Sequence, residues 1–289
     1  MIISVLSGGI GNQLFQYAAG KALALSTDQA HQYLYDPRLN SIARDFALGN
    51  FRLTSLPAKI SQVFPQWLMT PYSSLVTLNN WGCKLGLVQT QIICQRSFNF
   101  EPISRLKTDR SLMTGYWQSE LFFKSHAKTI SKEFTFIKPL SVDNSKFMQR
   151  SQDRTLVSVH IRRGDYLSAS NLNQRAICDL DYYLQAAQLI KQKITHPTFV
   201  IFSDDLSWCK QNIHLGKNQI FVDWNQADSV QDLQLMTRCQ HHIIVNSTFS
   251  WWGAWLNPSQ KKIVVSPKIW LNNPALNTTD VIPKTWIKI

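Results

Sequence analysis

Strand-like and helix-like segments alternate through the second half of the chain, and this order restricts the fold more than any other feature. Short runs rich in branched apolar residues lie at 156–161, 198–203, 219–222, 242–246 and 262–266. Helix-like stretches separate several of them, at 181–194, 229–240 and 247–256. Strands that alternate with helices of this length predict an α/β fold, in which a parallel sheet carries helices on both faces.

The N-terminal residues predict a second α/β domain. A β-branched run at 2–6 enters the glycine-rich turn SGGIGNQ, and the apolar positions 14, 15, 18, 22 and 25 that follow fit a helix. The region 40–150 is aromatic, basic and interrupted by prolines, and it predicts little beyond a helix that begins within 115–123. A chain of 289 residues accommodates two domains, which we place at 1–150 and 151–289.

Composition narrows the class of protein. Hydrophobic residues make up 44% and charged residues 17%, which predicts a folded chain. The net charge of +12 favours an anionic partner: nucleic acid, a membrane surface or a phosphorylated small molecule. The five scattered cysteines include no C-x-x-C pair, the first residues do not resemble a signal peptide, and no apolar run reaches about 18 residues. We therefore expect a cytoplasmic protein without a zinc site.

Polar side chains gather where the predicted strands end. Ligands of open parallel sheets bind outside the carboxyl ends of the strands. His160, Arg162, Arg163 and Asp165 stand at the end of the run 156–161. The corresponding residues at two later strand ends are Asp204, Asp205, Asn246, Ser247, Thr248 and Ser250. Three polar strand ends predict one binding site at this edge of the sheet.

The first cluster has the chemistry of a phosphate clamp. Because side chains alternate along a strand, His160 and Arg162 should share one face, and Arg163 should diverge from them unless the strand has already ended. A planar guanidinium binds phosphate oxygens through two parallel hydrogen bonds. The alternative is a pair of surface arginines bonded to a neighbouring carboxylate such as Asp165.

Three further motifs bear on ligand binding. The stretch from Asn246 to Thr248 predicts a helix N-terminus that binds an anion, although its hydroxyls could simply cap the helix. The turn Gly9-x-Gly11 lacks the third glycine of a dinucleotide fingerprint and the Gly-Lys-Ser/Thr of a P-loop, so it predicts only a close backbone approach. The acidic stretch 179–181 resembles a metal-binding D-x-D, but Asp181 stands where an N-cap belongs, and we predict no metal.

Together these motifs resemble a known family. GGIGNQLFQYA, GYWQSELFF, HIRRGDY, FVIFSDDLSWCK and NSTFSWWGAWLN are similar to blocks of the α-1,2-fucosyltransferases of glycosyltransferase family 11, in the family's order and over nearly the whole chain. The resemblance implies a bacterial member with a GT-B-type fold, in which two Rossmann-like domains with parallel sheets face a cleft. It also implies an inverting, metal-independent transfer of L-fucose from GDP-β-L-fucose to the 2-hydroxyl of a terminal galactose. The acceptor would be an oligosaccharide or a lipid-linked glycan of O-antigen type. The net charge of +12 independently suggests peripheral contact with the inner membrane, where lipid-linked acceptors would be met.

The resemblance also implies roles for individual residues. His160, Arg162 and Arg163 would bind GDP, with Arg162 on the diphosphate, and Asp232 would bind guanine. Ser247, Thr248 and Ser250 would hold the β-phosphate. Gly9, Gly11, Asn12 and Gln13 would face the fucose and the reacting centre. The general base stays open among Asp165, Asp204, Asp205 and Glu120, with Asp165 favoured because it lies near the arginines.

No cofactor beyond the donor is implied, and no basic stripe or aromatic RNP-like pattern predicts a nucleic-acid partner. The rival hypothesis is a protein that binds polyanions or membrane surfaces without catalysis, which the net charge of +12 suggests.

Overall fold

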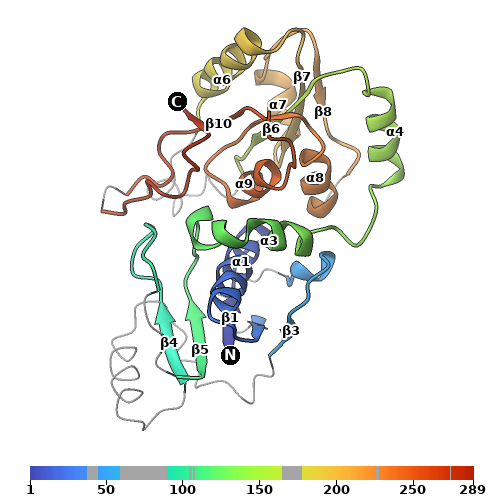
Figure 1. The fold of residues 1–289 in the computed structure, drawn as a ribbon. Coiled ribbons are helices and arrows are strands. Elements are labelled where there is room, and N and C mark those ends of the chain that lie inside the picture. The colour runs from blue at the N-terminus through green and yellow to red at the C-terminus, as the bar shows by residue number, and fades with distance from the viewer. Residues whose placement is uncertain are drawn as a thin grey trace. The chain divides into compact units, whose positions relative to one another are not determined.

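The computed structural model divides into two compact units, and Figure 1 traces the chain through them. It describes residues 1–37, 45–58, 90–103, 106, 108–164, 178–225, 228–273 and 275–289. The first unit comprises Met1–Ile137 with Thr279–Val281, and the second comprises Lys138–Thr278 with Ile282–Ile289. The division therefore falls after Ile137 and not after residue 150, and three residues near the C-terminus belong to the first unit.

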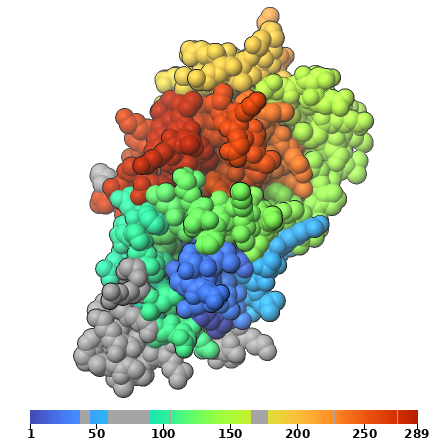
Figure 2. Space-filling model, viewed as in Figure 1, coloured from blue at the N-terminus to red at the C-terminus, as the bar shows by residue number. Residues whose placement is uncertain are grey.

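The chain divides before residue 150 because α4 (Val142–Arg150) belongs to the second unit. Its Asn144 side chain donates to Gln231 Oε1 at 3.1 Å, and the Phe147 ring packs on Trp224 with 5.4 Å between centroids. Figure 2 shows this light green segment against the orange residues of the same unit. The helix thus covers the core of the second unit.

In the first unit, five described strands form a parallel sheet in the order β3-β2-β1-β5-β4. Its strands are β1 (Ile2–Leu6), β2 (His31–Tyr35), β3 (Leu56–Pro57), β4 (Thr90–Cys94) and β5 (Arg110–Thr114). The helix α1 (Ile10–Ser26) follows β1, as the apolar spacing predicts, and packs Ala19 and Ala24 with Ile2 and Met113 of the sheet. The predicted helix within 115–123 is wrong: Glu120–Phe122 form a single 3-10 turn, and α3 spans Ala127–Glu133.

In the second unit, six described strands form a parallel sheet in the order β11-β10-β9-β6-β7-β8. Its strands are β6 (Leu156–Ile161), β7 (Thr198–Ser203), β8 (Gln219–Phe221), β9 (His241–Ile243), β10 (Val264–Ser266) and β11 (Ile287–Lys288). The helices described after α4 are α6 (Leu180–Lys193), α7 (Leu206–Asn212), α8 (Ser229–Met236) and α9 (Thr248–Trp255). The predicted parallel sheet is confirmed, although β9 ends three residues before the expected position 246.

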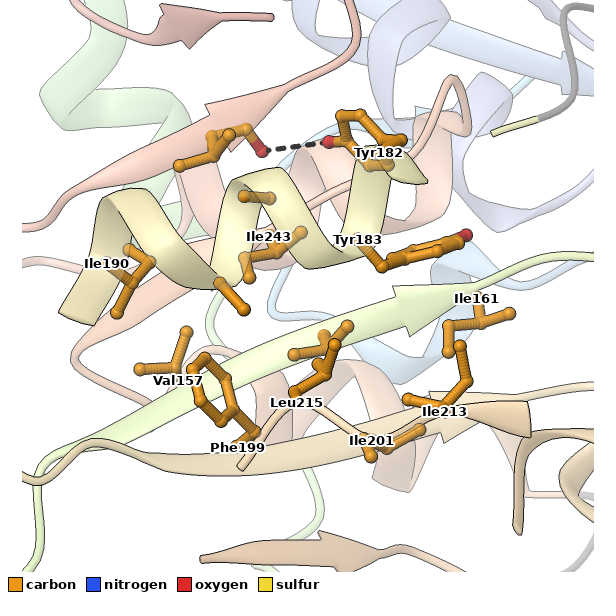
Figure 3. Close-up of a cluster of buried hydrophobic side chains, with 14 of the residues drawn as sticks. Val157, Ile161, Tyr182, Tyr183, Ile190, Phe199, Ile201, Ile213, Leu215 and Ile243 are labelled. Carbon is orange, nitrogen blue, oxygen red and sulfur yellow. Dashed lines mark hydrogen bonds between the residues drawn. The ribbon is translucent and has the colours of Figure 1, made fainter. Parts of the chain in front are cut away.

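Alternation along β6 sends its side chains into two separate cores. Val157 and Ile161 lie under α6 with Tyr183 and Ile190, as Figure 3 shows. The opposite face carries Leu156 and residues of β7 against α8, and Figure 1 shows α6 and α8 on different sides of the sheet. Burial of apolar side chains on both faces is the pattern of a parallel sheet. It leaves the carboxyl edge of the strands as the place for polar side chains.

No helix in the described ranges combines the length and apolar character needed to cross a membrane.

Candidate active site

The carboxyl ends of β6 and β7 bring Arg162 and Asp204 together, because these strands are neighbours and Ile161 pairs with Ser203. Arg162 Nε lies 3.2 Å from Asp204 Oδ2. The same carboxylate accepts from two main-chain groups, Arg163 N–H at 2.9 Å and Gly164 N–H at 3.1 Å. A Cβ at position 164 would lie 2.8 Å from Asp204 Oδ2, so a larger residue there would displace the carboxylate. Asp204 therefore fixes both the arginine and the backbone that follows it.

Arg163 takes a different direction, as strand alternation predicts. Its guanidinium carbon lies 3.6 Å from the centroid of the Trp208 ring on α7, and its Nε lies 3.4 Å from Asp205 Oδ2. Asp205 Oδ1 in turn accepts from the Trp208 main-chain N–H at 3.1 Å and caps α7. Arg163 is thus held between a carboxylate and an aromatic face, whereas the neighbouring Arg162 contacts Asp204.

His160 is a buried, neutral imidazole. Its ring packs on Phe249 of α9 at 5.3 Å between centroids, and only 5% of the residue is exposed. Burial, with the nearby Arg162 charge, lowers the pKa of His160 to about 3. Its Nδ1 has no hydrogen-bond partner among the described residues. A buried polar atom left unsatisfied is uncommon and often marks a functional position.

The N-terminus of α9 stands after β9, the neighbour of β6 on its other side. Ser247 occupies the N-cap position, and its side chain makes no capping hydrogen bond, so the simple capping interpretation is wrong. The first N–H groups of a helix attract anions through their free donors and the helix dipole. Ser247 and Thr248 therefore stand at a helix start that can receive a phosphate.

Two other residues predicted at this helix have structural contacts. Ser250 is fully buried and its hydroxyl donates to the Ser247 carbonyl at 3.3 Å. The Asn246 amide donates to the Trp270 carbonyl at 3.1 Å. Both side chains contact the chain around the helix start, and their contact with the donor stays a prediction.

Asp232 lies in the first turn of α8, in the same unit as the arginines. Its Oδ1 accepts from the Asn225 amide at 2.8 Å. Burial raises the pKa of Asp232 to about 6, with a further rise from the nearby Asp228. A half-buried carboxylate with a raised pKa is the kind of group that binding sites use.

In the first unit, the turn between β1 and α1 holds the predicted residues. Gly9 is the N-cap of α1, and a Cβ there would meet no described heavy atom within 4 Å, so a ligand has room to approach. Gly11 is buried in the first turn. Asn12 Oδ1 accepts from Gln118 Nε2 at 3.1 Å, which brings the segment after β5 beside this turn.

Gln13 contradicts its predicted role. The side chain is fully buried; its amide donates to the carbonyls of Gly8 and Asp45, and its oxygen accepts from the Ala47 N–H. Two of these contacts hold the main chain of residues 45–47, and the third joins the side chain to Gly8 in the turn before α1. Gln13 therefore has no group directed to a sugar, and its position is explained by structure.

Comparison with known proteins agrees with these features. The model of the family "Glycosyl transferase family 11" matches residues 103–289. The chain belongs to glycosyltransferase family 11. It is 32% identical to the alpha-1,2-colitosyltransferase of Escherichia coli over 302 residues, covering 100% of this chain and 99% of that protein. The O-antigen biosynthesis glycosyltransferase WbnK of Escherichia coli is 29% identical, with 99% of each chain covered.

More distant relatives extend the likeness. Galactoside alpha-(1,2)-fucosyltransferase 1 of Alouatta belzebul is 28% identical over 86% of this chain and 63% of its own. The crystal structure of NodZ alpha-1,6-fucosyltransferase soaked with GDP-fucose superposes with a TM-score of 0.52 at 15% identity, covering 89% of this chain and 92% of that one. Together with the two parallel sheets, this likeness confirms the predicted fold of two Rossmann-like domains of GT-B type.

Two predictions about carboxylates need comment in this family 11 protein. The favoured base, Asp165, lies outside the described residues. Glu120 Oε1 lies 3.6 Å from Lys124 Nζ on the same segment. In the D-x-D stretch, the N-cap of α6 is Asp179, whose side chain accepts from the Tyr182 N–H, so the prediction that Asp181 caps the helix is wrong by two positions.

The sequence did not identify Trp208 as a site residue, and it did not indicate that Arg162 contacts Asp204 and Arg163 contacts Asp205. The spacing Asp205-x-x-Trp208 is that of an N-cap and its N3 residue, and it could have indicated that Asp205 caps a short helix. Nothing local indicates that the tryptophan ring also lies under Arg163.

Proposed function

We propose that this family 11 transferase moves L-fucose from GDP-β-L-fucose to the 2-hydroxyl of a terminal galactose, with inversion and without a metal ion. The observation that carries the proposal is the arginine pair at the carboxyl edge of the second sheet, where Arg162 and Arg163 are each held by an aspartate. Two fixed guanidinium charges beside a helix N-terminus match the charge and shape of a nucleoside diphosphate.

The leaving group determines the proposed role of Arg162. Cleavage of the bond between sugar and diphosphate leaves negative charge on the β-phosphate, and donors that are already in place stabilise that charge in the transition state. Arg162 engages Asp204 through Nε, and the terminal nitrogens of a guanidinium carry four of its five N–H donors. We assign these terminal donors to the diphosphate, together with the main-chain N–H groups after Ser247 at the start of α9.

Asp232 is the proposed guanine-binding group. A carboxylate accepts from the N1–H and the exocyclic amine of guanine, two adjacent donors that adenine does not present. Desolvation strengthens such a contact because the effective dielectric constant is low. The position of Asp232 within the first turn of α8, beside the Asn225 amide, supports this role.

The acceptor hydroxyl needs a general base in the proposed mechanism. Asp204 and Asp205 already accept hydrogen bonds from the arginines and from main-chain N–H groups, so we assign them to positioning. His160 has a pKa of about 3 because it is buried, and such a weakly basic imidazole is a poor proton acceptor at neutral pH. Asp165 is therefore our proposed base for the acceptor hydroxyl.

A second donor has specific support, since the Escherichia coli relative that is 32% identical is named an alpha-1,2-colitosyltransferase. Colitose differs from fucose by lacking the 3-hydroxyl, so the same diphosphate and guanine contacts serve both GDP sugars. The relative named for O-antigen biosynthesis supports a bacterial surface glycan as the product. The net charge of +12 would favour approach to lipid-linked acceptors at an anionic membrane.

The deciding experiment offers GDP-L-fucose and GDP-L-colitose in competition, with galactose-terminated disaccharides as acceptors. NMR of the product gives the linkage position and the anomeric configuration. We expect transfer to O2 and an α-L product, which is inversion from a β-linked donor. Transfer of neither sugar, or a β-L product, would contradict the proposal. A preference for GDP-L-colitose would change the donor and keep the rest of the mechanism.

The rival hypothesis of a non-catalytic polyanion-binding protein predicts a different dependence on salt. Binding to polyanions releases counterions and weakens steeply as salt rises. Binding of GDP in a pocket of two arginines should change far less between 50 and 200 mM salt. Membership of a transferase family favours the enzyme.

A further inference from the structure

Among the Phe, Tyr and Trp side chains in the described part of the chain, only that of Tyr116 is exposed, at 43%. The other Phe, Tyr and Trp rings in the described ranges are buried or half-buried, as expected for large apolar groups. A single exposed ring in such a protein suggests a ligand that covers it.

The ring stands where ligands of α/β sheets bind. Tyr116 is the second residue after β5, and its ring stacks on Phe98, which follows β4, with 6.4 Å between centroids and an interplanar angle of 12°. The strands β4 and β5 are parallel neighbours, and Figure 1 shows them side by side. The two rings therefore form a platform, defined here as Tyr116 and Phe98, at the carboxyl edge of the first sheet.

The backbone under the platform is fixed in an unfavourable conformation. Gln95 Oε1 accepts from the Tyr116 N–H at 2.9 Å and from the Trp117 N–H at 2.7 Å. Gly115 has φ of 136° and Trp117 has φ of 56°, and a tryptophan in the left-handed region is uncommon. Strain of this kind persists where surrounding contacts impose it, and it gathers at functional sites.

The same arrangement presents the arginines in the second unit. Asp204, the first residue after β7, accepts from the second and third main-chain N–H groups after β6. Gln95, the first residue after β4, accepts from the second and third N–H groups after β5. By position, Tyr116 corresponds to Arg163. Each unit thus uses a side chain of the neighbouring strand to hold a loop that carries a ligand-facing group.

A second observation points to a missing partner at this place. Only 7% of Gln95 is exposed, and its Nε2 has no hydrogen-bond partner among the described residues. An unsatisfied amide donor is unfavourable in a protein interior. The Gln95 amide adjoins the loop that carries Tyr116.

We propose that the platform of Tyr116 and Phe98 is the stacking surface for the terminal galactose of the acceptor. In a β-galactopyranoside the axial 4-hydroxyl leaves the C–H groups at positions 3, 4 and 5 on the opposite side, as one apolar face that fits an aromatic ring. In the glucose epimer the 4-hydroxyl is equatorial and this face is smaller. The proposal rests on the proposed function for the identity of the sugar.

Saturation-transfer NMR on the full chain with GDP tests the platform directly. The probes are methyl β-D-galactopyranoside and methyl β-D-glucopyranoside. We expect saturation at H3, H4 and H5 of the galactoside and weaker transfer to the glucoside. Tyr116→Ala should weaken galactoside binding about tenfold, equivalent to about 1.4 kcal/mol. Tyr116→Phe should stay within about twofold, because the ring remains, and this variant guards against loss of folding.

Leu56 is the matched control, since it lies in the same unit and is 69% exposed. Leu56→Ala should leave galactoside binding unchanged. In turnover assays Tyr116→Ala should raise the acceptor KM about tenfold with an unchanged KM for the GDP sugar. Unchanged galactoside binding in Tyr116→Ala, or no saturation of the galactoside by the natural protein, would overturn the platform.

Failure of the platform and failure of the proposed function give different results. If fucose is transferred to galactosides but Tyr116→Ala keeps the natural acceptor KM, the platform is wrong and the function stands. If no fucose is transferred but galactoside binding still depends on the Tyr116 ring, the proposed function is wrong and the platform stands.

Discussion

Replacing Arg162 with lysine keeps the positive charge and removes the geometry on which the proposed mechanism depends. In the structure Arg162 Nε lies 3.2 Å from Asp204 Oδ2, so one edge of the guanidinium is already engaged. The other edge would bind the diphosphate through parallel N–H donors. A lysine ammonium is a single point charge and cannot span Asp204 and the diphosphate in the same way.

The expected fall in kcat/KM of Arg162→Lys corresponds to the loss of one charge-assisted hydrogen bond. Such a bond contributes about 1.5–3 kcal/mol, which corresponds to roughly a 10- to 150-fold fall in kcat/KM. Because the charge on the leaving diphosphate grows in the transition state, kcat should fall and not only KM. Steady-state kinetics with GDP-fucose and a galactoside acceptor measure both constants.

Arg163→Lys is the matched control, because it makes the same chemical change one residue away. Arg163 stacks on Trp208 and contacts Asp205, and a lysine can keep part of both contacts. A cation–π contact or an ion pair at an exposed site contributes up to about 1 kcal/mol. We therefore expect no more than about a fivefold fall in kcat/KM. Near-normal kcat in Arg162→Lys with an inactive Arg163→Lys would refute the assignment of the diphosphate to Arg162.

Three further predictions concern ligands and pH. GDP at about 100 times its Kd should stabilise the fold by roughly 2.7 kcal/mol and raise Tm, whereas ADP should not; equal shifts would remove Asp232 from guanine binding. Burial raises the pKa of Asp232 to about 6, and only the ionised form accepts from both donors of guanine with its two oxygens, so the KM for GDP-fucose should rise as pH falls below about 6 and lose this dependence in Asp232→Asn. EDTA should leave transfer largely intact; loss of activity that Mn²⁺ restores would instead indicate a metal at Asp179 and Asp181.

The sheet of the second unit could be predicted from the sequence because its signals are local. The runs at 156–161 and 198–203 coincide with β6 and β7, since β-branched and aromatic residues bounded by polar ones have few alternatives to a buried strand. Alternation along β6 also predicted that Arg163 diverges from His160, and the contacts of the two side chains with Trp208 and Phe249 confirm it.

The contacts that complete the site could not be predicted, because they join residues far apart in the chain. Arg163 meets Asp204 across 41 residues, through a strand pairing whose register only the folded sheet determines. Gln13 carries an amide that could bind a sugar, yet this amide is hydrogen-bonded to main-chain groups 32 and 34 residues away. The central region failed for a further reason, because the helices α3 and α4 have few apolar residues to mark their period.

The two strand-edge loops suggest why the holding side chain differs between the units. In the second unit the loop carries two arginines, and the holder is an aspartate, whose charge pairs with Arg162 while it binds the Arg163 and Gly164 N–H groups. In the first unit the loop carries the neutral Tyr116, and the holder is Gln95, which binds the same pair of N–H positions. An unpaired carboxylate at the buried position of Gln95 would be unfavourable. The amide fixes the loop without adding charge, as a surface for an uncharged sugar requires, whereas the aspartate orients cations for a diphosphate.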